Sequence, residues 1–351
     1  MKKVIFISAL AIAAAVSCTK SEIVDTKFNE EIGFEGYIGR AAQTKATVID
    51  NSNIAEETIG LYGFYTGANP WKIGDKKDVA GAIDNPTPNL WANDELYNEA
   101  GWKTDEKKYW TNAEDFYSFL AYAPYATDNG LTATTTANPT VTYTDPVTVE
   151  DQIDLLYAVP VFNRQRGTAD TPTPVGLTMK HALSRIAIKA KEDHDDYTYT
   201  ITGLSLSGTF VQEKTFSLVE SKWVEDGAKT GATTYNFVVE NNAVTIDKTV
   251  SADYVSCVGE EYLMIIPTAV EEAVLTVTYT TSYGTDKIVS KPINKNVKIT
   301  ETFEQGKAYT INLTFEPNSD EEIKFTVDVA LWDEVKDGAT VETTVDKTIE
   351  A

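Results

Sequence analysis

Apolar side chains alternate with polar ones along several stretches of this chain, and no stretch sustains the period of an amphipathic helix. The alternation is clearest at Tyr235–Val239, Leu275–Tyr279 and Tyr309–Phe315. Side chains that face the core at every second position predict strands with one buried face. Thr, Val, Tyr and Ile are abundant, and such β-branched and aromatic residues favour strands. We therefore predict an all-β fold.

The length of the chain, 351 residues, exceeds what one hydrophobic core usually serves, so we expect two domains. A hydrophilic run, Lys191–Asp196, separates two halves that have the same strand-and-turn rhythm. We place the boundary there and predict an N-terminal β-sandwich at 41–192 and a C-terminal β-sandwich at 193–351. Just before the run, the apolar residues of Met179–Ala190 change sides, which predicts a bulge or twist within one strand.

The N-terminus has the features of a signal peptide at 1–17. Its apolar run, Val4–Val16, follows a short basic stretch and is too short to span a membrane stably. The run ends before Cys18, and small residues before a Cys resemble the lipobox of bacterial lipoproteins, although Ala15 stands where that pattern usually has Leu. Two interpretations stay open: an ordinary signal peptide that contains a Cys, or a lipoprotein signal whose Cys18 is lipidated. We expect the second, with the membrane reached only through the lipid anchor.

Ile32, Phe34 and Ile38 fall on one side of a predicted strand that would bury them. The strand runs into a lone basic residue, Arg40, after which a trypsin-like protease could cut, before Ala41, if the loop is exposed. Loss of the strand would leave an apolar groove with unpaired backbone groups in the folded sheet. We therefore interpret this strand as sacrificial and the vacated groove as the functional feature of the chain.

The chain ends on two alternating strands. The first carries Ile323, Phe325, Val327, Val329 and Leu331 on one face and closes on Trp332. After a turn, a weaker strand carries Val341 and Val345 and runs to Ala351. Strands at the end of a chain suit insertion into the sheet edge of another molecule. Two interpretations stay open: these residues form a donor strand, or they form a hairpin that completes the second domain of their own chain.

Several segments, in their order along the chain, resemble the fimbrillins, the type V pilin subunits of Gram-negative anaerobes, including their Mfa-like relatives. They are the lipoprotein start at Cys18, Phe119–Tyr125, Asp154–Ala158, Leu177–Leu183, Phe303–Tyr309 and Val329–Trp332. The resemblance spans most of the chain. It implies two transthyretin-like, Greek-key β-sandwich domains and export as a lipoprotein to the outer membrane and cell surface.

The resemblance also implies a pilus subunit that polymerises by strand exchange and supports adhesion. Cleavage by an arginine-specific protease after Arg40 would make 18–40 a propeptide, and Lys45 is the alternative site for a protease of broader specificity. The implied partners are other pilin subunits, the protease, and host or bacterial surface glycans or proteins. A net charge of −23, from 30 basic and 53 acidic residues, makes nucleic acid a poor partner.

Few residues could support catalysis, so we expect neither an enzyme nor a metal or cofactor site. The chain has two histidines. His181 lies in an apolar strand, where a hydrogen-bonded structural role is expected. His194 lies in a charged linker and has no second cluster of ligands in the sequence. Cys257 has a strand-like setting that predicts a buried thiol.

Residues 67–105 are expected to form loops, because Gly, Pro, Asn and Asp cluster there. Strands are expected on either side, at Thr58–Thr66 and Asp115–Tyr125. Five aromatic residues fall in or near the loops: Trp71, Trp91, Trp102, Tyr109 and Trp110. Exposed, they could stack on sugar rings; packed down, they would belong to the core. The alternative function is therefore a glycan-binding surface lipoprotein, which would keep its first strand and stay monomeric.

Overall fold

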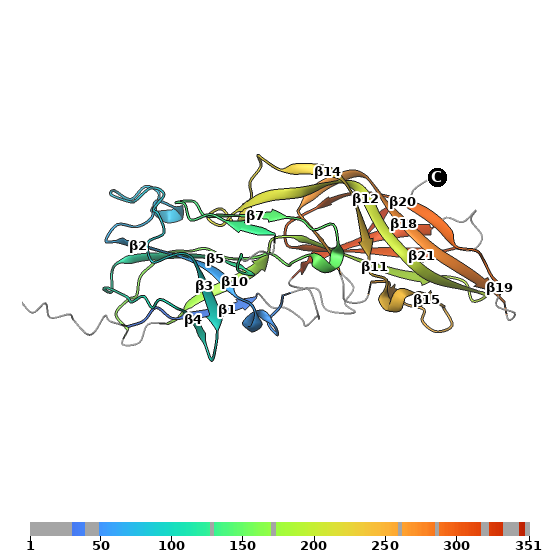
Figure 1. The fold of residues 1–351 in the computed structure, drawn as a ribbon, viewed down its shortest axis with the longest axis horizontal. Coiled ribbons are helices and arrows are strands. Elements are labelled where there is room, and N and C mark those ends of the chain that lie inside the picture. The colour runs from blue at the N-terminus through green and yellow to red at the C-terminus, as the bar shows by residue number, and fades with distance from the viewer. Residues whose placement is uncertain are drawn as a thin grey trace, which may run out of the picture.

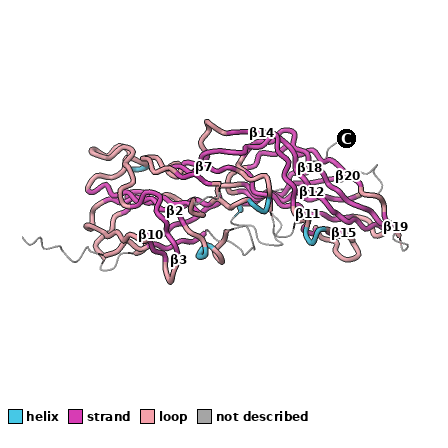
Figure 2. The backbone as a smooth tube through the Cα atoms, viewed as in Figure 1, coloured by secondary structure: helices cyan, strands magenta, loops and turns pink. Residues whose placement is uncertain are grey.

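The computed structural model of the protein describes residues 30–38, 49–126, 130–169, 173–258, 262–284, 288–316, 323–332 and 344–347. Within these ranges the chain forms strands joined by loops and short 3₁₀ helices, so the predicted all-β class is confirmed (Figure 2). The 3₁₀ helices of the described residues are η2 (Ile54–Glu56), η3 (Gly74–Lys76), η4 (Val149–Asp151) and η5 (Glu240–Asn242). None of them has the length and apolar character that crossing a membrane requires.

The first sheet closes on itself. Its strands are β1 (Phe34–Ile38), β2 (Ile59–Gly67), β3 (Trp91–Asn98), β4 (Trp102–Thr104), β5 (Phe116–Ala123), β8 (Leu156–Ala158), β9 (Val161–Arg164) and β10 (Val175–His181). Neighbours follow the order β2-β3-β4-β1-β10-β8-β5-β9, and a further pairing of β2 with β5 completes a ring of strands that includes β1. These strands bury one apolar cluster, to which Phe34, Trp91, Phe119 and Leu177 belong.

Two of these strands lie where loops were predicted. Because β3 and β4 fall within residues 67–105, the loop prediction was wrong for these segments. The sequence signal was weak, since β3 buries only Trp91 and Leu96 of its eight residues. Pairing with β2 on one side and β4 on the other holds β3 in the sheet. The strands predicted on either side are confirmed as β2 and β5, and β5 ends one residue before Pro124.

Two further sheets form a β-sandwich. The six-stranded sheet contains β11 (Ser184–Glu192), β16 (Val255–Ser256), β17 (Leu263–Ile265), β21 (Lys307–Phe315), β22 (Ile323–Leu331) and β23 (Thr344–Lys347). The nine-stranded sheet contains β6 (Leu131–Ala133), β7 (Thr140–Thr144), β12 (Tyr197–Ser217), β13 (Lys222–Trp223), β14 (Lys229–Phe237), β15 (Val244–Ile246), β18 (Thr268–Tyr283), β19 (Ile288–Val289) and β20 (Ile293–Phe303). Both sheets contribute to one apolar cluster, which includes Ile188, Ile311, Leu206 and Leu275.

The molecule is elongated, with the closed sheet toward one end and the sandwich toward the other (Figure 1). The chain between β5 and β8 of the closed sheet adds two strands to the sandwich, because β7 pairs with the end of β12 and β6 pairs with β7. A second apolar cluster joins them, with members as far apart in sequence as Tyr62, Phe216 and Trp332. The division of the chain at residues 192 and 193 remains a prediction.

The stretch Met179–Ala190 is not one strand with a bulge. It contains the end of β10, which belongs to the closed sheet, and the start of β11, which belongs to the sandwich. Ala182 and Leu183 lie between the two strands and are fully buried. The change of side in the apolar pattern therefore marks the passage of the chain from one sheet to another, and the predicted bulge was wrong.

The carboxyl group of Asp145 is buried in the protein interior. Asp145, just after β7, accepts hydrogen bonds from the Tyr235 hydroxyl and from Gln152 Nε2, the latter at 3.0 Å. Gln152 in turn accepts a hydrogen bond from the Met264 backbone N–H at 2.8 Å. Burial raises the pKa of the Asp145 carboxyl to about 7, although these hydrogen bonds favour the charged form. The folded protein therefore holds this proton at pH values where the unfolded chain has lost it.

The raised pKa predicts a pH dependence of stability. Between about pH 4 and about pH 7 the folded state binds more protons at Asp145 than the unfolded state, so the free energy of unfolding should fall as the pH rises. We expect a loss of about 2–4 kcal/mol over this range and no further change above it from this group. Urea unfolding of Asp145→Asn should show a flatter profile, whereas exposed Asp151→Asn, with the same charge change, should keep the slope. Equal slopes in both variants would contradict the assignment.

Candidate functional site

The segment Glu30–Ile38, here called the leading segment, occupies an interior position of the closed sheet. Along one side, β1 pairs in parallel with β10, from Phe34 opposite Val175 to Ile38 opposite Met179. Along the other side, Phe34 pairs with Trp102 of β4. The ladder continues before β1, because the Ile32 N–H donates to the Lys108 carbonyl at 2.9 Å and the Trp110 N–H donates to the Glu30 carbonyl at 3.0 Å. Removal of the segment would therefore open the ring of strands and free backbone groups on both sides.

The leading segment buries the face that its sequence pattern predicts. Ile32 is 3% exposed and Phe34 is 8% exposed. The Phe34 ring packs edge-on against Trp91 at 5.4 Å and against Phe119 at 5.6 Å between ring centroids. Ile38 lies in β1, but its side chain is outside the described residues. The vacated position would be an apolar groove lined by aromatic rings.

The leading segment carries acidic residues at its start and on the face opposite to Ile32 and Phe34. They lie near basic residues of the rest of the chain from residue 41 onward, here called the body. Lys107 Nζ lies 2.6 Å from Glu31 Oε2. The Arg166 Nε–H donates to Glu30 Oε2 at 2.8 Å, and Arg166 Nη2 donates to the same oxygen. The Arg166 side chain is fully buried, and its Nη1 donates to the carbonyls of Gly167 and Ala169. Sequence reasoning missed these pairs because the partners stand 76 and 136 positions apart.

A third basic residue, Arg164, stands beside the same segment. Burial lowers the pKa of its guanidinium, and the charge of Glu35 in β1 opposes that change. Arg164 Nη2 donates to the Thr173 carbonyl at 2.6 Å, and the guanidinium carbon lies 5.8 Å from the centroid of the Trp110 ring. Two acidic residues of the leading segment, Glu30 and Glu31, thus pair with basic residues of the rest of the chain, and the charge of the third, Glu35, acts on Arg164.

The predicted processing residues lie outside the described residues. These are Cys18, Arg40 and Ala41, together with Lys45. The described chain resumes at Ile49, whose N–H donates to Asp154 Oδ2 at 2.9 Å. The start of the body is therefore anchored in the protein interior just after the predicted cleavage region.

The predicted donor residues divide into two groups. β22 pairs with β21 over its full length, and Phe325 and Val327 are buried in the sandwich core. Val329 is partly buried there, and Leu331 is 48% exposed. In this structure Ile323–Leu331 is thus a strand of the chain's own sheet, as the hairpin interpretation expects. β23 pairs with β22 over four positions and lies at the end of the strand order, while Val341 and the side chain of Val345 lie outside the described residues.

Trp332 is also part of the body, where it joins a buried polar pair. It is 4% exposed and stacks on His181, with ring centroids 4.1 Å apart and planes at 2°. His181 Nδ1 lies 2.9 Å from Asp154 Oδ1, and Asp154 also holds Ile49. The predicted structural, hydrogen-bonded role of His181 is confirmed. Trp332, at the start of the C-terminal tail, and Ile49, near the start of the body, therefore both contact the buried His181–Asp154 pair.

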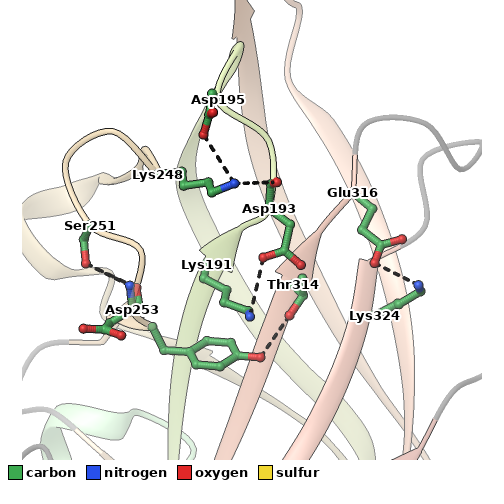
Figure 3. Close-up of polar contacts among 10 residues, drawn as sticks. Lys191, Asp193, Asp195, Lys248, Ser251, Asp253, Thr314, Glu316 and Lys324 are labelled. Atoms are coloured by element: carbon green, nitrogen blue, oxygen red, sulfur yellow. Dashed lines mark hydrogen bonds and ion pairs between the residues drawn. The ribbon is translucent and has the colours of Figure 1, made fainter.

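The other candidate residues do not form a reactive centre in the described part of the chain. Burial raises the pKa of the Cys257 thiol to about 12, and the predicted buried thiol is confirmed. The run around His194 is the turn between β11 and β12, where carboxylates pair with lysines (Figure 3). Lys191 Nζ lies 3.5 Å from Asp193, and Lys248 Nζ lies 3.3 Å from Asp195. No group of three or more potential metal ligands occurs among the described residues.

The aromatic residues proposed for sugar binding are mostly in the core. Trp71, Trp91 and Trp110 are at most 2% exposed, and Trp102 is partly buried. Tyr109 is 43% exposed. Within the described residues these side chains do not form a stacking surface, which weakens the glycan-binding alternative.

A closed sheet that includes the first described strand, joined to a β-sandwich, defines an all-β protein. Comparison with family models matches residues 44–332 to the fimbrillin-like family. The chain belongs to the fimbrillin-like family, which supports a role in pilus or adhesion structures at the cell surface.

One solved structure shares the fold. A fimbrial protein from Bacteroides vulgatus is 20% identical, with a TM-score of 0.70, and the match covers 87% of this chain and 100% of that one. Two candidate cell adhesion proteins align with lower scores. The one from Bacteroides uniformis is 17% identical, with a TM-score of 0.46 over 86% and 99% of the two chains, and the one from Bacteroides ovatus is 16% identical, with a TM-score of 0.49 over 92% and 99%. A comparison with curated protein sequences finds no match.

Proposed function

We propose that this protein is a pilus subunit that is exported as a lipoprotein through Cys18, cut after Arg40, and polymerised by strand exchange. The observation that carries the proposal is the place of the leading segment. It is an interior strand with backbone partners on both sides, and it precedes the only arginine in residues 1–48. Cleavage there would detach a strand that the closed sheet needs.

The vacated groove would be filled by a strand from a neighbouring subunit. Such a strand would restore the backbone ladder and could gain roughly 1.5–3 kcal/mol for each apolar side chain that it buries. Because the donor and the groove are different surfaces, the contact is heterologous and generates an open filament. Cleavage before insertion would make assembly irreversible and confine it to the cell surface.

The proposed donor is the tail after Trp332, with Val341 and Val345 as its apolar residues. The position of β22 supports this narrower assignment, since donation of β22 would break a full-length ladder with β21 and empty part of the sandwich core. Within the described residues, β23 pairs with β22 over four positions and lies at the end of the strand order. Release from the six-stranded sheet of its own chain would therefore cost less free energy for the tail than for β22.

Blocking the cleavage should abolish assembly. We expect the wild-type protein from the cell surface to start at Ala41, to carry no lipid and to form filaments. Arg40→Ala should instead retain a lipidated Cys18 and the leading segment, and it should stay monomeric. Lys45→Ala is the matched control and should behave like the wild type. Intact mass, N-terminal sequencing and electron microscopy distinguish these states, and filaments whose subunits still contain residues 30–38 would refute the proposal.

A further inference from the structure

Three basic residues, Lys107, Arg164 and Arg166, lie near the leading segment. The protein carries a net charge of −23, and residues 1–40 contain equal numbers of basic and acidic residues, so the body after cleavage keeps that charge. Two such bodies repel each other at long range. Near the leading segment, however, Lys107 pairs with Glu31 and Arg166 pairs with Glu30. The charge of Glu35 acts on a third basic residue, Arg164, which donates to the Thr173 carbonyl just before β10. This basic rim lies in an otherwise acidic molecule.

Departure of the leading segment would take three carboxylates away from this rim. The Arg166 Nε–H would lose the Glu30 oxygen that accepts its hydrogen bond. Since the Arg166 side chain is fully buried, loss of the paired carboxylate is costly there. Lys107, whose side chain is 59% exposed, would contribute mainly by attracting an acidic strand during encounter.

The C-terminal tail repeats the pattern of the leading segment. In the leading segment, Glu31 and Glu35 stand four positions apart, on the face opposite to Ile32 and Phe34. In residues 339–351 the acidic residues are Glu342, Asp346 and Glu350, also four positions apart. By the alternation of a strand, they fall on the face opposite to the apolar residues Val341, Val345 and Ile349. The tail can therefore turn the face with Val341, Val345 and Ile349, which also carries Lys347, toward the groove, and its acidic face toward Lys107 and Arg164. Glu30 lies on the same side of the strand as Ile32 and Phe34, so the acidic face of the tail has no counterpart to the partner of Arg166.

We infer that two members of this basic rim, Lys107 and Arg164, recognise carboxylates of the incoming strand and so select it, and that this strand is the acidic 339–351 segment of a second copy. This inference rests on the proposed strand exchange. It adds that charge pairing, besides apolar burial, selects which strand enters the groove. A strand with the same apolar residues but no carboxylates would fill the groove and leave the rim without its ligands. It would also lack the local attraction that offsets repulsion between two acidic bodies.

The test compares polymerisation of full-length chains after cleavage by trypsin. Glu342→Gln, Asp346→Asn and Glu350→Gln are combined in one variant. Its matched control combines Glu225→Gln, Glu271→Gln and Glu272→Gln, three exposed residues of the body, and has the same net charge. We expect the tail variant to polymerise about tenfold more slowly than the control at low salt. High salt should reduce the difference between the two polymerisation rates, because it screens the attraction between the acidic tail and the basic rim.

A second pair of variants tests the rim itself. Lys107→Gln changes an exposed side chain, so the variant should fold, and Lys222→Gln removes a lysine of similar exposure from β13. We expect only Lys107→Gln to slow polymerisation. Equal rates for the tail variant and its control, in wild-type-like filaments, would overturn the rim and leave strand exchange intact. Failure of the cleaved wild-type chain to polymerise would overturn the proposed function and this inference with it.

Discussion

Deletion of Ala339–Ala351 is expected to leave a folded, lipidated subunit that is cleaved normally but cannot polymerise. Of the described strands, the deletion removes only β23. β23 pairs with β22 over four positions at one end of the six-stranded order, so its loss should cost the subunit little stability. Assembly should nevertheless stop, because the deletion removes the strand that would fill the neighbouring groove.

Point variants test whether the apolar face of the tail is the feature that polymerisation needs. Val341→Asp combined with Val345→Asp places charges on the apolar face of the tail and should also stop polymerisation, since a groove lined by aromatic rings excludes unpaired charge. Thr344→Asp combined with Thr348→Asp adds the same charge on the other face and should polymerise. Electron microscopy of cleaved protein measures the outcome. Filaments of normal length from the deletion or from the valine variant would exclude the tail as donor.

Phe34→Ala is expected to destabilise the uncleaved protein by about 3–5 kcal/mol, the usual range for removing a buried aromatic ring. The ring is 8% exposed and meets Trp91 and Phe119, so its loss leaves a cavity among rigid aromatic neighbours. Tyr37→Ala is the matched control in the same strand. Its side chain is 47% exposed, and its removal should cost less than about 1 kcal/mol. Urea unfolding of the uncleaved chains measures both.

The same substitution should have no effect on the assembled filament. If the leading segment departs after cleavage at Arg40, residue 34 is absent from the filament, and filaments from Phe34→Ala precursors should dissociate at the same denaturant concentration as wild type. The variant should therefore lower the stability of the uncleaved precursor without changing the stability of the filament. Filaments weakened to the same extent as the precursor would show that the leading segment stays in the assembled subunit.

Sequence reasoning succeeded where a strand carries its own pattern. The alternation at Tyr309–Phe315 predicted β21, and Ile32 and Phe34 were correctly expected to face the core. It failed where neighbours impose the strand: β3 buries two residues of eight, and its pairing with β2 and β4 lies beyond local pattern. It also misread Met179–Ala190, because a change of side within a strand and a passage between sheets leave the same mark in sequence.

Local alternation and composition were enough to predict the all-β class, the apolar face of the leading segment and the acidity of both the leading segment and the tail. The packed sheets were needed to show that β1 is an interior strand of a closed sheet, that β22 pairs within its own sandwich, and that Arg166 meets Glu30. These features join residues far apart along the chain, and the burial that stabilises them exists only once the sheets have packed. Local sequence records which face of a strand is apolar; the strand that will lie beside it is chosen by the fold.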